Sequence, residues 1–327
     1  MRDFAYQGAE SLDEAQHLAA HPEAMLLAGG TTLVDLAKCG VAQPERVVDI
    51  GGLKGLDHIT VSDAGATIGA LAKMSHVADH PAIKQNFPAI SESLWQAASA
   101  QLRNMATIGG NLLQRTRCAY FRDPITFPSC NKRAPGSGCA AIGGVTRNHA
   151  VLGTSTACIA TYPGDLAIAL VAFDAVVELG ARSLPIESFF LAPGDRPDCE
   201  HDMAPGEIIT AVTIPASPAA RRSTYLKVRD RQSYEFAAAS AAVGLELEPD
   251  GKTIRDIRVA LGGVATKPWR ARAVETALRG TVLEPDTVRQ ASRLAVEGAV
   301  DHGDNRYKIE LAPRVVARAI LSLGEQA

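Results

Sequence analysis

Four of the six cysteines fall within one stretch of the chain, and these residues point most directly to chemistry. They are Cys118, Cys130, Cys139 and Cys158, separated by eleven, eight and eighteen residues. Structural zinc sites usually pair their ligands two to four residues apart, and this pairing is absent. Iron-sulfur clusters accept four separate thiolates from a long loop. The spacing therefore favours an iron-sulfur cluster, with zinc and with free or disulfide-forming cysteines as alternatives.

The residues between these cysteines are typical of an irregular loop. The segment CAYFRDPITFPSCNKRAPGSGC, residues 118–139, contains proline, which opposes helix formation, and glycine, which allows close backbone approach. Asp123 is the only acid between residues 93 and 164. A four-thiolate cluster and a flavin diphosphate both carry negative charge that nearby cations would offset, and a solvated or partner-facing basic loop is the alternative. The basic residues are Arg103, Arg115, Arg117, Arg122, Lys132 and Arg133.

Two Thr/Gly segments have the composition of phosphate-binding turns. LLAGGTTL, residues 26–33, follows an apolar strand and precedes a predicted helix, and ATIGGNLL, residues 106–113, repeats the chemistry. Backbone N–H groups at a helix start face an anion, and glycine lets a phosphate approach the main chain. Neither segment matches the Rossmann or P-loop motif. Together they suit a dinucleotide pyrophosphate held from two sides, whereas an ordinary tight turn is the alternative for each.

The pattern of apolar residues predicts an α+β protein of two domains. Residues 25–50 indicate a small βαβ unit, and a strand at ATIGALA and a helix at FPAISESLWQAASA follow. IPASPAARRS has the composition of a linker, so we place a boundary near residue 220. Beyond it, TYLKVRDR, AAASAAVGLELE and IRDIRVALGGV predict a three-stranded antiparallel sheet, and three amphipathic segments predict a three-helix bundle.

Composition excludes several classes of protein. The chain has 327 residues and a net charge of −3, so it has no broad basic field for nucleic acid or an anionic membrane. No apolar run approaches the roughly 18 residues that a membrane span requires. The first residues lack a basic segment followed by an apolar one, so we expect no signal peptide in this chain. The sequence alone therefore favours a cytoplasmic location.

Several motifs together resemble one family over essentially the whole chain. AGGTTL, ATIGGNLLQ, YPGDLAIAL and YLKVRDRQSYEFA look like the FAD-binding medium subunit of the molybdenum hydroxylases, the xanthine dehydrogenase and carbon monoxide dehydrogenase group. The cysteine-bearing insertion is similar to that of the flavin subunit of periplasmic aromatic aldehyde oxidoreductases, which carries an extra [4Fe-4S] cluster. The resemblance implies an FAD-binding domain at residues 1–220, made of a βαβ subdomain at about 1–55, a mixed or antiparallel sheet with helices, and a cysteine loop at about 115–160. Residues 221–327 would form the C-terminal flavoprotein domain.

The resemblance also implies which residues bind cofactors. Cys118, Cys130, Cys139 and Cys158 would ligate the [4Fe-4S] cluster, and Tyr234 would approach the flavin or be an ordinary buried aromatic residue. Asp165 would accept hydrogen bonds from ribose, amide or water, and Lys227 would contact the flavin or face solvent. Together with these last two, the implied FAD-binding residues are Leu26, Leu27, Ala28, Gly29, Gly30, Thr31, Thr32, Leu33, Thr107, Ile108, Gly109, Gly110 and Asn111.

The function implied by the resemblance is electron transfer within a complex. A large subunit with a molybdenum cofactor would oxidise aromatic aldehydes to acids, and a small subunit with [2Fe-2S] clusters would pass electrons to the FAD of this chain and then to an external acceptor. No catalytic constellation is expected here, because the cofactor carries the chemistry. Co-export with a signal-bearing partner would place the complex in the periplasm. The rival hypotheses are a stand-alone flavin oxidoreductase and a zinc-stabilised binding module.

Overall fold

Alternating strands and short helices at the N-terminus form a small parallel sheet. The computed structural model describes residues 1–325. Its first elements are β1 (Ala5–Gly8), α1 (Leu12–Ala19), β2 (Ala24–Leu27), α2 (Leu33–Lys38) and β3 (Arg46–Asp49). Strand β3 lies between β1 and β2, and both pairings are parallel. The β2–α2–β3 crossover is the predicted βαβ unit. All residues of β1 are exposed, so the sequence contains no apolar pattern that would predict this strand.

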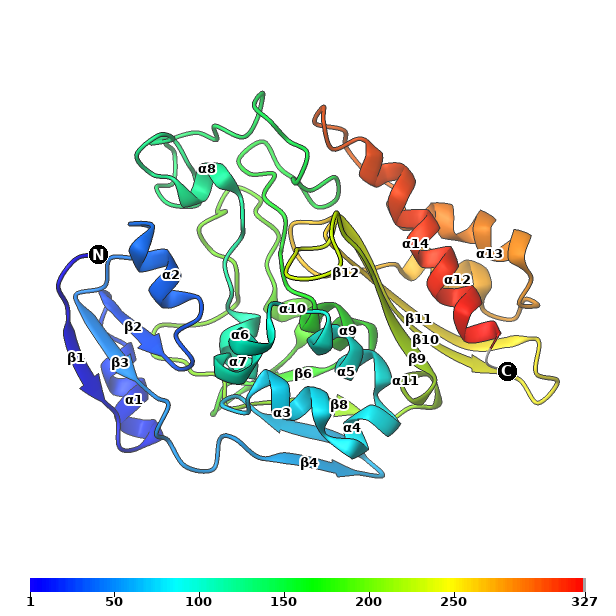
Figure 1. Cartoon of the computed structure of the whole chain (residues 1–327), viewed down its shortest axis with the longest axis horizontal. Coiled ribbons are helices and arrows are strands. Elements are labelled where there is room, and N and C mark those ends of the chain that lie inside the picture. The colour runs from blue at the N-terminus through cyan, green and yellow to red at the C-terminus, as the bar shows by residue number, and fades with distance from the viewer. Residues whose placement is uncertain (326–327) are drawn as a thin grey trace.

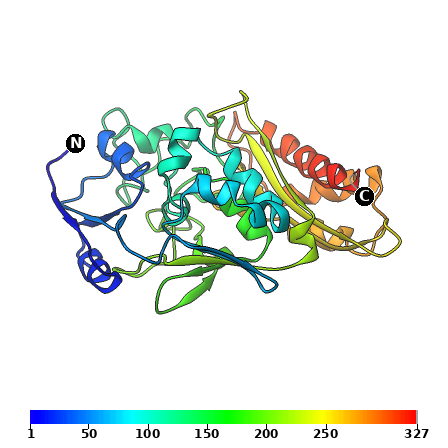
Figure 2. The ribbon, with the colours of Figure 1, turned by 60° about the horizontal axis from the view of Figure 1, so that its bottom comes forward.

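A five-stranded antiparallel sheet forms the middle of the molecule, in the order β4-β5-β8-β6-β7. Strands β4 (Ile59–Ser62) and β5 (Gly65–Gly69) precede the cysteine region, and β6 (Val176–Glu178), β7 (Ser183–Pro185) and β8 (Ala211–Pro215) follow it. The cyan helices lie beside this sheet in Figure 2, and they are α3 (Met74–Asp79), α4 (Pro81–Asn86), α5 (Pro88–Trp95), α6 (Ala100–Met105) and α7 (Ile108–Leu112). Helix α9 (Leu166–Ala172) is buried at every residue and packs against α5 in the central core.

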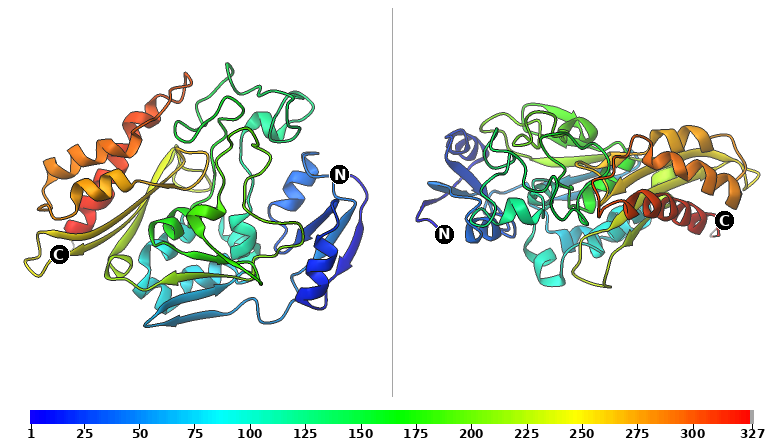
Figure 3. Two further views of the ribbon diagram at one scale, coloured as in Figure 1. Left: turned by 180° about the vertical axis from the view of Figure 1, so that it is seen from behind. Right: turned by 90° about the horizontal axis from the view of Figure 1, so that it is seen from above.

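The C-terminal part combines an antiparallel sheet with helices, as predicted. After α11 (Pro218–Arg221), its strands are β9 (Ser223–Val228), β10 (Ala239–Leu247), β11 (Ile254–Gly262) and β12 (Trp269–Arg270), in the order β12-β11-β10-β9. Strand β12 adds two residues to the three predicted strands. The helices are α12 (Arg272–Leu278), α13 (Pro285–Ser292), the 3₁₀ turn η1 (Arg293–Val296) and α14 (Tyr307–Gly324). Figure 3 shows this part at the opposite end of the molecule from the N-terminal unit.

The cysteine region spans the top of the molecule in Figure 1, between the N-terminal unit and the C-terminal part. Between α7 and α9, the helix in this region is α8 (Ala119–Arg122). Phe121 and Cys130 pack with Leu36 and Ala42, so the loop rests on the α2 segment. Helix α10 (Ile186–Phe189) comes later in the chain. Within residues 1–325, no helix is both long and apolar enough to cross a membrane.

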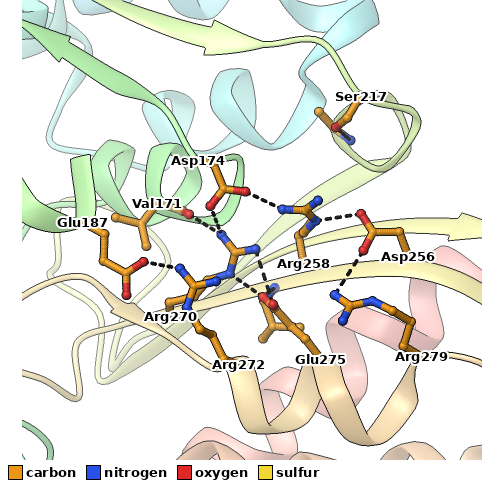
Figure 4. Close-up of polar contacts among 12 residues, drawn as sticks. Val171, Asp174, Glu187, Ser217, Asp256, Arg258, Arg270, Arg272, Glu275 and Arg279 are labelled. Atoms are coloured by element: carbon orange, nitrogen blue, oxygen red, sulfur yellow. Dashed lines mark hydrogen bonds and ion pairs between the residues drawn. The ribbon is translucent and has the colours of Figure 1, made fainter. Parts of the chain in front are cut away.

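A network of charged residues connects the middle of the molecule with the C-terminal part (Figure 4). The buried guanidinium of Arg270 donates to the carbonyl oxygen of Val171 at 2.6 Å and pairs with Asp174 at 3.0 Å. The same guanidinium contacts the buried carboxylate of Glu275, and Arg258 bridges Asp174 and Asp256. These contacts fix the end of α9 against β11, β12 and α12. The predicted α+β fold class is confirmed.

Candidate functional site

The two Thr/Gly segments, far apart in the sequence, meet in the structure. A Cβ atom added to Gly29 would lie 2.1 Å from the carbonyl oxygen of Met105 and 3.0 Å from the Cα atom of Ala106. Met105 directly precedes the second segment, and Ala106 is its first residue. Gly30 has a φ of +71°, the left-handed region that favours glycine. The absence of a side chain at Gly29 therefore allows the first turn to lie directly against the chain that enters the second.

The second segment forms a sharp turn that one of its own side chains stabilises. The Thr107 hydroxyl accepts a hydrogen bond from the N–H group of Gly110, at 3.3 Å, at the start of α7. The N–H group of Gly109 donates to the carbonyl oxygen of Ala70 at 2.8 Å. A Cβ atom on Gly109 would lie 3.0 Å from that of Ala70. Glycine at this position therefore permits close packing on the chain that leaves β5.

A cavity of about 380 Å³ separates the two segments from the rest of the N-terminal unit. This volume is within the range of small-molecule sites. Of residues 26–33, all except Leu27 line it, and so do Thr107, Gly109 and Gly110 of the second segment. Ile108 instead lies in the central hydrophobic core. The predicted binding residues thus divide into those that face the cavity and those that support it.

A second cavity, of about 450 Å³, shares Thr31 with the first and contains the remaining predicted residues. Asn111, Asp165, Lys227 and Tyr234 line it. The side-chain oxygen Oδ1 of Asn111 is buried and has no hydrogen-bond partner among the described residues. Two adjoining cavities with the predicted residues distributed between them are suited to an elongated ligand with two chemically different ends.

Asp165 and Lys227 form a buried ion pair at this second cavity. Lys227 Nζ lies 2.8 Å from Asp165 Oδ2, and the Tyr225 hydroxyl donates to Asp165 Oδ1 at 2.7 Å. Lys227 also donates to the carbonyl oxygen of Gln96, at 3.0 Å. Burial raises the pKa of the Asp165 carboxyl, although the Lys227 cation opposes this. Asp165 was predicted to accept hydrogen bonds from ribose, amide or water, and in the structure it accepts them from Tyr225 and Lys227; Lys227 is buried rather than facing solvent.

Two residues at the wall of the second cavity have unusual backbone conformations. Ala98 has a φ of +49° and Tyr234 has a φ of +53°, which lie in a region that residues other than glycine rarely adopt. Both line the cavity. Tyr234 is 57% exposed, so it is not the ordinary buried aromatic residue of the alternative interpretation. Strained backbone of this kind tends to occur at ligand sites, where the surrounding structure maintains it.

The cysteine region brings its four thiols near one another without forming a disulfide bond. Cys130 and Cys139 form an isolated β-bridge, and Cys118 immediately precedes α8. The thiol of Cys118 interacts electrostatically with those of Cys130 and Cys158, and Cys158 also interacts with Cys139. Burial raises the pKa of Cys118 to about 12 and also raises that of Cys158. These thiols are therefore protonated at neutral pH unless a metal replaces the proton.

Four cysteine thiols are the donors that this region offers to a metal. Across residues 1–325, no three or more His, Cys, Asp or Glu side chains come together as a site for one metal ion. A cluster differs from an ion because its thiolates bind separate iron atoms at its corners and stay apart. The four cysteines are free, and Gly136 and Gly138, with φ of +84° and +97°, shape the loop between Cys130 and Cys139.

The basic residues around the cysteines are largely paired with acids from distant parts of the sequence. Arg117 and Arg122 both contact Asp35, on α2. Arg115 and Lys132 both contact Glu200, the latter at 2.9 Å. Asp35 and Glu200 bring two negative charges to these four cations, so part of the positive charge is balanced within the chain and the rest could still offset a bound anion. The sequence shows only that acids are scarce near these cations, so it does not predict their pairing with acids from distant segments.

Sequence reasoning missed one wall of the first cavity. Residues from the segment 203–209 line it opposite the glycine turns, and Ala70 and Leu71 contribute from the end of β5. Glu207 of that segment pairs with Arg182 at 2.6 Å and so is not a free charge. In the sequence this segment has the composition of a turn. Its distinguishing feature in the structure is the left-handed backbone of Gly206. The lining residues are Met203, Gly206, Glu207, Ile208 and Ile209.

Comparison with known families covers almost the entire chain. Residues 2–217 match the family described as the FAD binding domain in molybdopterin dehydrogenase. Residues 224–323 match the family described as the CO dehydrogenase flavoprotein C-terminal domain. The two matches meet near α11, the segment that the sequence suggested as a linker.

Individual relatives are similar over their full length. The aldehyde oxidoreductase FAD-binding subunit PaoB of Escherichia coli (strain K12) is 44% identical over 335 residues, covering 100% of both chains. The carbon monoxide dehydrogenase medium chain of Hydrogenophaga pseudoflava is 26% identical, covering 97% of this chain and 96% of the relative. Among solved structures, the reconstituted CO dehydrogenase from Oligotropha carboxidovorans superimposes with a TM-score of 0.76 at 23% identity, over 100% of this chain and 99% of the other.

Proposed function

The chain belongs to the FAD-binding medium subunits of the molybdenum hydroxylases, and on that premise we propose that it is the electron-transfer subunit of an aldehyde oxidoreductase. The full-length similarity to the aldehyde oxidoreductase subunit supports this choice among the enzymes of the family. The structural observation that carries the proposal is the contact of Gly29 with Met105 and Ala106, which brings two glycine turns to one cavity. The substrate would be oxidised on a partner chain.

The proposed FAD site extends over both cavities. Backbone N–H groups of residues 29–32 would bind the diphosphate, since glycine leaves the main chain accessible there. The second segment would form the facing wall, because the N–H groups of Gly109 and Gly110 are already bonded to Ala70 and Thr107. Asn111 would offer its unpaired Oδ1 to a donor of the cofactor. The Asp165–Lys227 pair would hold the wall of the second cavity rather than contact the diphosphate. Bound FAD would supply the electron-carrying chemistry, and the chain would bind it, orient it and limit its contact with water.

We propose that Cys118, Cys130, Cys139 and Cys158 hold a [4Fe-4S] cluster. Support comes from four free cysteine thiols in one loop region, the number of thiolates that a [4Fe-4S] cluster requires. The proposal includes a large subunit with the molybdenum cofactor and a small [2Fe-2S] subunit as partners. It also includes aromatic aldehydes as substrates, periplasmic location by co-export with a signal-bearing partner, and a domain boundary near residue 220.

The decisive experiment is an absorption spectrum of the anaerobically purified chain, with iron, zinc and released flavin measured on the same sample. FAD and about four irons per chain are expected. A colourless zinc protein would support the zinc-module alternative, and turnover of an organic substrate by the isolated chain would support the stand-alone flavin enzyme.

The ligand assignment is tested separately by two matched variants. Cys130→Ser removes a proposed ligand and is expected to lower the iron content and the broad iron-sulfur absorption while FAD is retained. Cys199→Ser changes a cysteine outside the proposed set and is expected to leave both unchanged. An unchanged iron content in Cys130→Ser would contradict the assignment of Cys130 as a ligand without affecting the flavin proposal.

A further inference from the structure

The ring of His149 lies against the sulfur of the first proposed cluster ligand. His149 Nε2 is 3.2 Å from Cys118 Sγ, and His149 is only 5% exposed. We infer that His149 donates a hydrogen bond from Nε2–H to the Cys118 sulfur and thereby raises the reduction potential of the cluster. The inference rests on the proposed cluster, and it assigns to His149 a positioning role that acts through Cys118.

The backbone at His149 is held in place by the C-terminal part of the molecule as well as by its own loop. The backbone N–H of His149 donates to Thr146, and Thr146 Oγ1 in turn donates to the carbonyl oxygen of His302 at 2.9 Å. The Asn305 side chain donates to the carbonyl oxygens of His149 and Ala150, at 3.4 Å and 2.9 Å. The backbone of His149 is thus fixed from several directions, and its ring lies near both Cys118 and the ring of Tyr120.

The surroundings of the two ring nitrogens determine which one carries the proton. His149 Nδ1 is buried and has no hydrogen-bond partner among the described residues. Nδ1 is without a partner in either neutral tautomer, so the difference between them lies at Nε2: a ring protonated at Nδ1 would direct a nitrogen lone pair at sulfur. A ring protonated at Nε2 directs its donor at sulfur instead. Once Cys118 is bound to iron, its sulfur carries no proton and can only accept.

The expected effect follows from the charge that the cluster gains on reduction. A hydrogen bond to a ligand sulfur withdraws electron density and so favours the reduced, more negative state. His149 would keep its proton when a bound cluster is reduced by one electron, because Nε2–H would only strengthen its hydrogen bond to sulfur. Removal of the donor should therefore lower the midpoint potential while leaving the four iron–sulfur ligands in place.

The test is a redox titration of the full-length chain, purified anaerobically, with the cluster followed by electron paramagnetic resonance. His149→Phe keeps the ring size without the donor, and His149→Gln keeps a side-chain N–H group. We expect His149→Phe to change the oxidised-to-reduced ratio about tenfold at fixed potential, a midpoint about 59 mV lower for a one-electron couple. His149→Gln should stay near the wild-type midpoint.

A matched control separates this effect from general disturbance of a buried histidine. The ring of His201 packs against Phe189 and Phe190 and forms no hydrogen bond with a cysteine thiol, so His201→Phe should leave the midpoint unchanged. An unchanged midpoint in His149→Phe with full iron content would overturn the inference and leave the cluster proposal intact. Iron loss in both His149 variants would also overturn it, because the ring would then only brace the loop. Absence of iron from the wild-type chain would overturn the cluster proposal itself.

Discussion

Individual residues at the proposed site are constrained more by their neighbours than by a ligand. Gly29 has no room for a side chain because the carbonyl oxygen of Met105 occupies that space. Asp165 is charged only if Lys227 compensates for its burial, since burial alone raises the pKa of the carboxyl. Substitutions at these positions therefore affect the cavity through the backbone or through an uncompensated charge.

Gly29→Ala is expected to reduce FAD binding. The added Cβ would overlap the Met105 carbonyl oxygen, so the two turns must separate, at a cost of about 1–3 kcal/mol in unfolding free energy. Flavin content per chain and thermal unfolding would be measured together. Gly52→Ala is the control, because a Cβ there meets nothing within 4 Å. Full flavin content in Gly29→Ala would show that the turns are not held at this spacing.

Lys227→Met is expected to destabilise the fold by about 3–5 kcal/mol, because it leaves the carboxylate of Asp165 buried without a cation. The double variant Asp165→Asn/Lys227→Met should recover part of the loss, since no unpaired charge remains. Chemical denaturation of the single and double variants measures this coupling. Additive losses would contradict the interpretation of the two residues as one unit.

The sequence predicted that the two glycine segments act together, and the structure brings both to one cavity; that these residues bind FAD stays a prediction. Both glycine segments were recognisable because turn glycines between apolar runs are a local signal. Their convergence depends on the backbone contact at Gly29, which no local pattern encodes. The pairing of Arg117 with Asp35 and of Lys132 with Glu200 was invisible for the same reason, because each pair joins segments far apart in the sequence.

At the scale of elements, long periodic segments were predictable and short ones were not. Strands β9, β10 and β11 and helix α14 carry clear apolar patterns, and the structure forms them where expected. Strand β1 is exposed throughout and β12 has only two residues, so neither has a pattern to detect. Helix α14 also contains a buried lysine in its first turn, Lys308, which donates to the carbonyl oxygen of Gly263 at 2.5 Å.

The stability contributed by α14 should depend on pH through Lys308. Burial lowers the pKa of Lys308 to about 8, below the value of about 10.4 in an unfolded chain. Between these pH values the unfolded state binds more protons, so stability rises with pH across this window. Below pH 8 both states are charged, and the cost of burying the charge is fully present.

Lys308→Met is therefore expected to be stabilised relative to wild type at pH 7, with an advantage that shrinks as the pH rises toward 10. Urea unfolding at several pH values measures the difference. Lys252→Met, which removes an exposed lysine, should show no such trend. A pH-independent difference for Lys308→Met would mean that Lys308 is not neutral in the folded state at high pH.

At the scale of the whole molecule, a charged network rather than an apolar surface alone joins the two halves. Arg270 is its centre, with a side chain that is 1% exposed and contacts from both sides of the junction (Figure 4). The sequence placed a boundary near residue 220 because of its linker composition. It could not show that a residue fifty positions further along fastens the halves together.

Arg270→Met is expected to lower the unfolding free energy by about 3–5 kcal/mol, because it leaves the buried carboxylate of Glu275 without its cation. Differential scanning calorimetry should show a broader transition as the halves unfold less cooperatively. Arg289→Met breaks the exposed pair with Asp286 and should cost at most about 1 kcal/mol. Equal losses for the two variants would contradict the role given to Arg270.

The pairing of β5 with β8 has a consequence for how the chain acquires its structure during synthesis. Residues 65–69 pair with residues 211–215, and the whole cysteine region lies between them. Such non-local pairing is slow, because the entropy cost of closing the long loop comes before any strand contact forms to offset it. The central sheet can close only after the ribosome has released Pro215, whereas β9, β10 and β11 pair with sequence neighbours. The cysteines are therefore synthesised, and exposed to the cell, before the sheet beneath them exists.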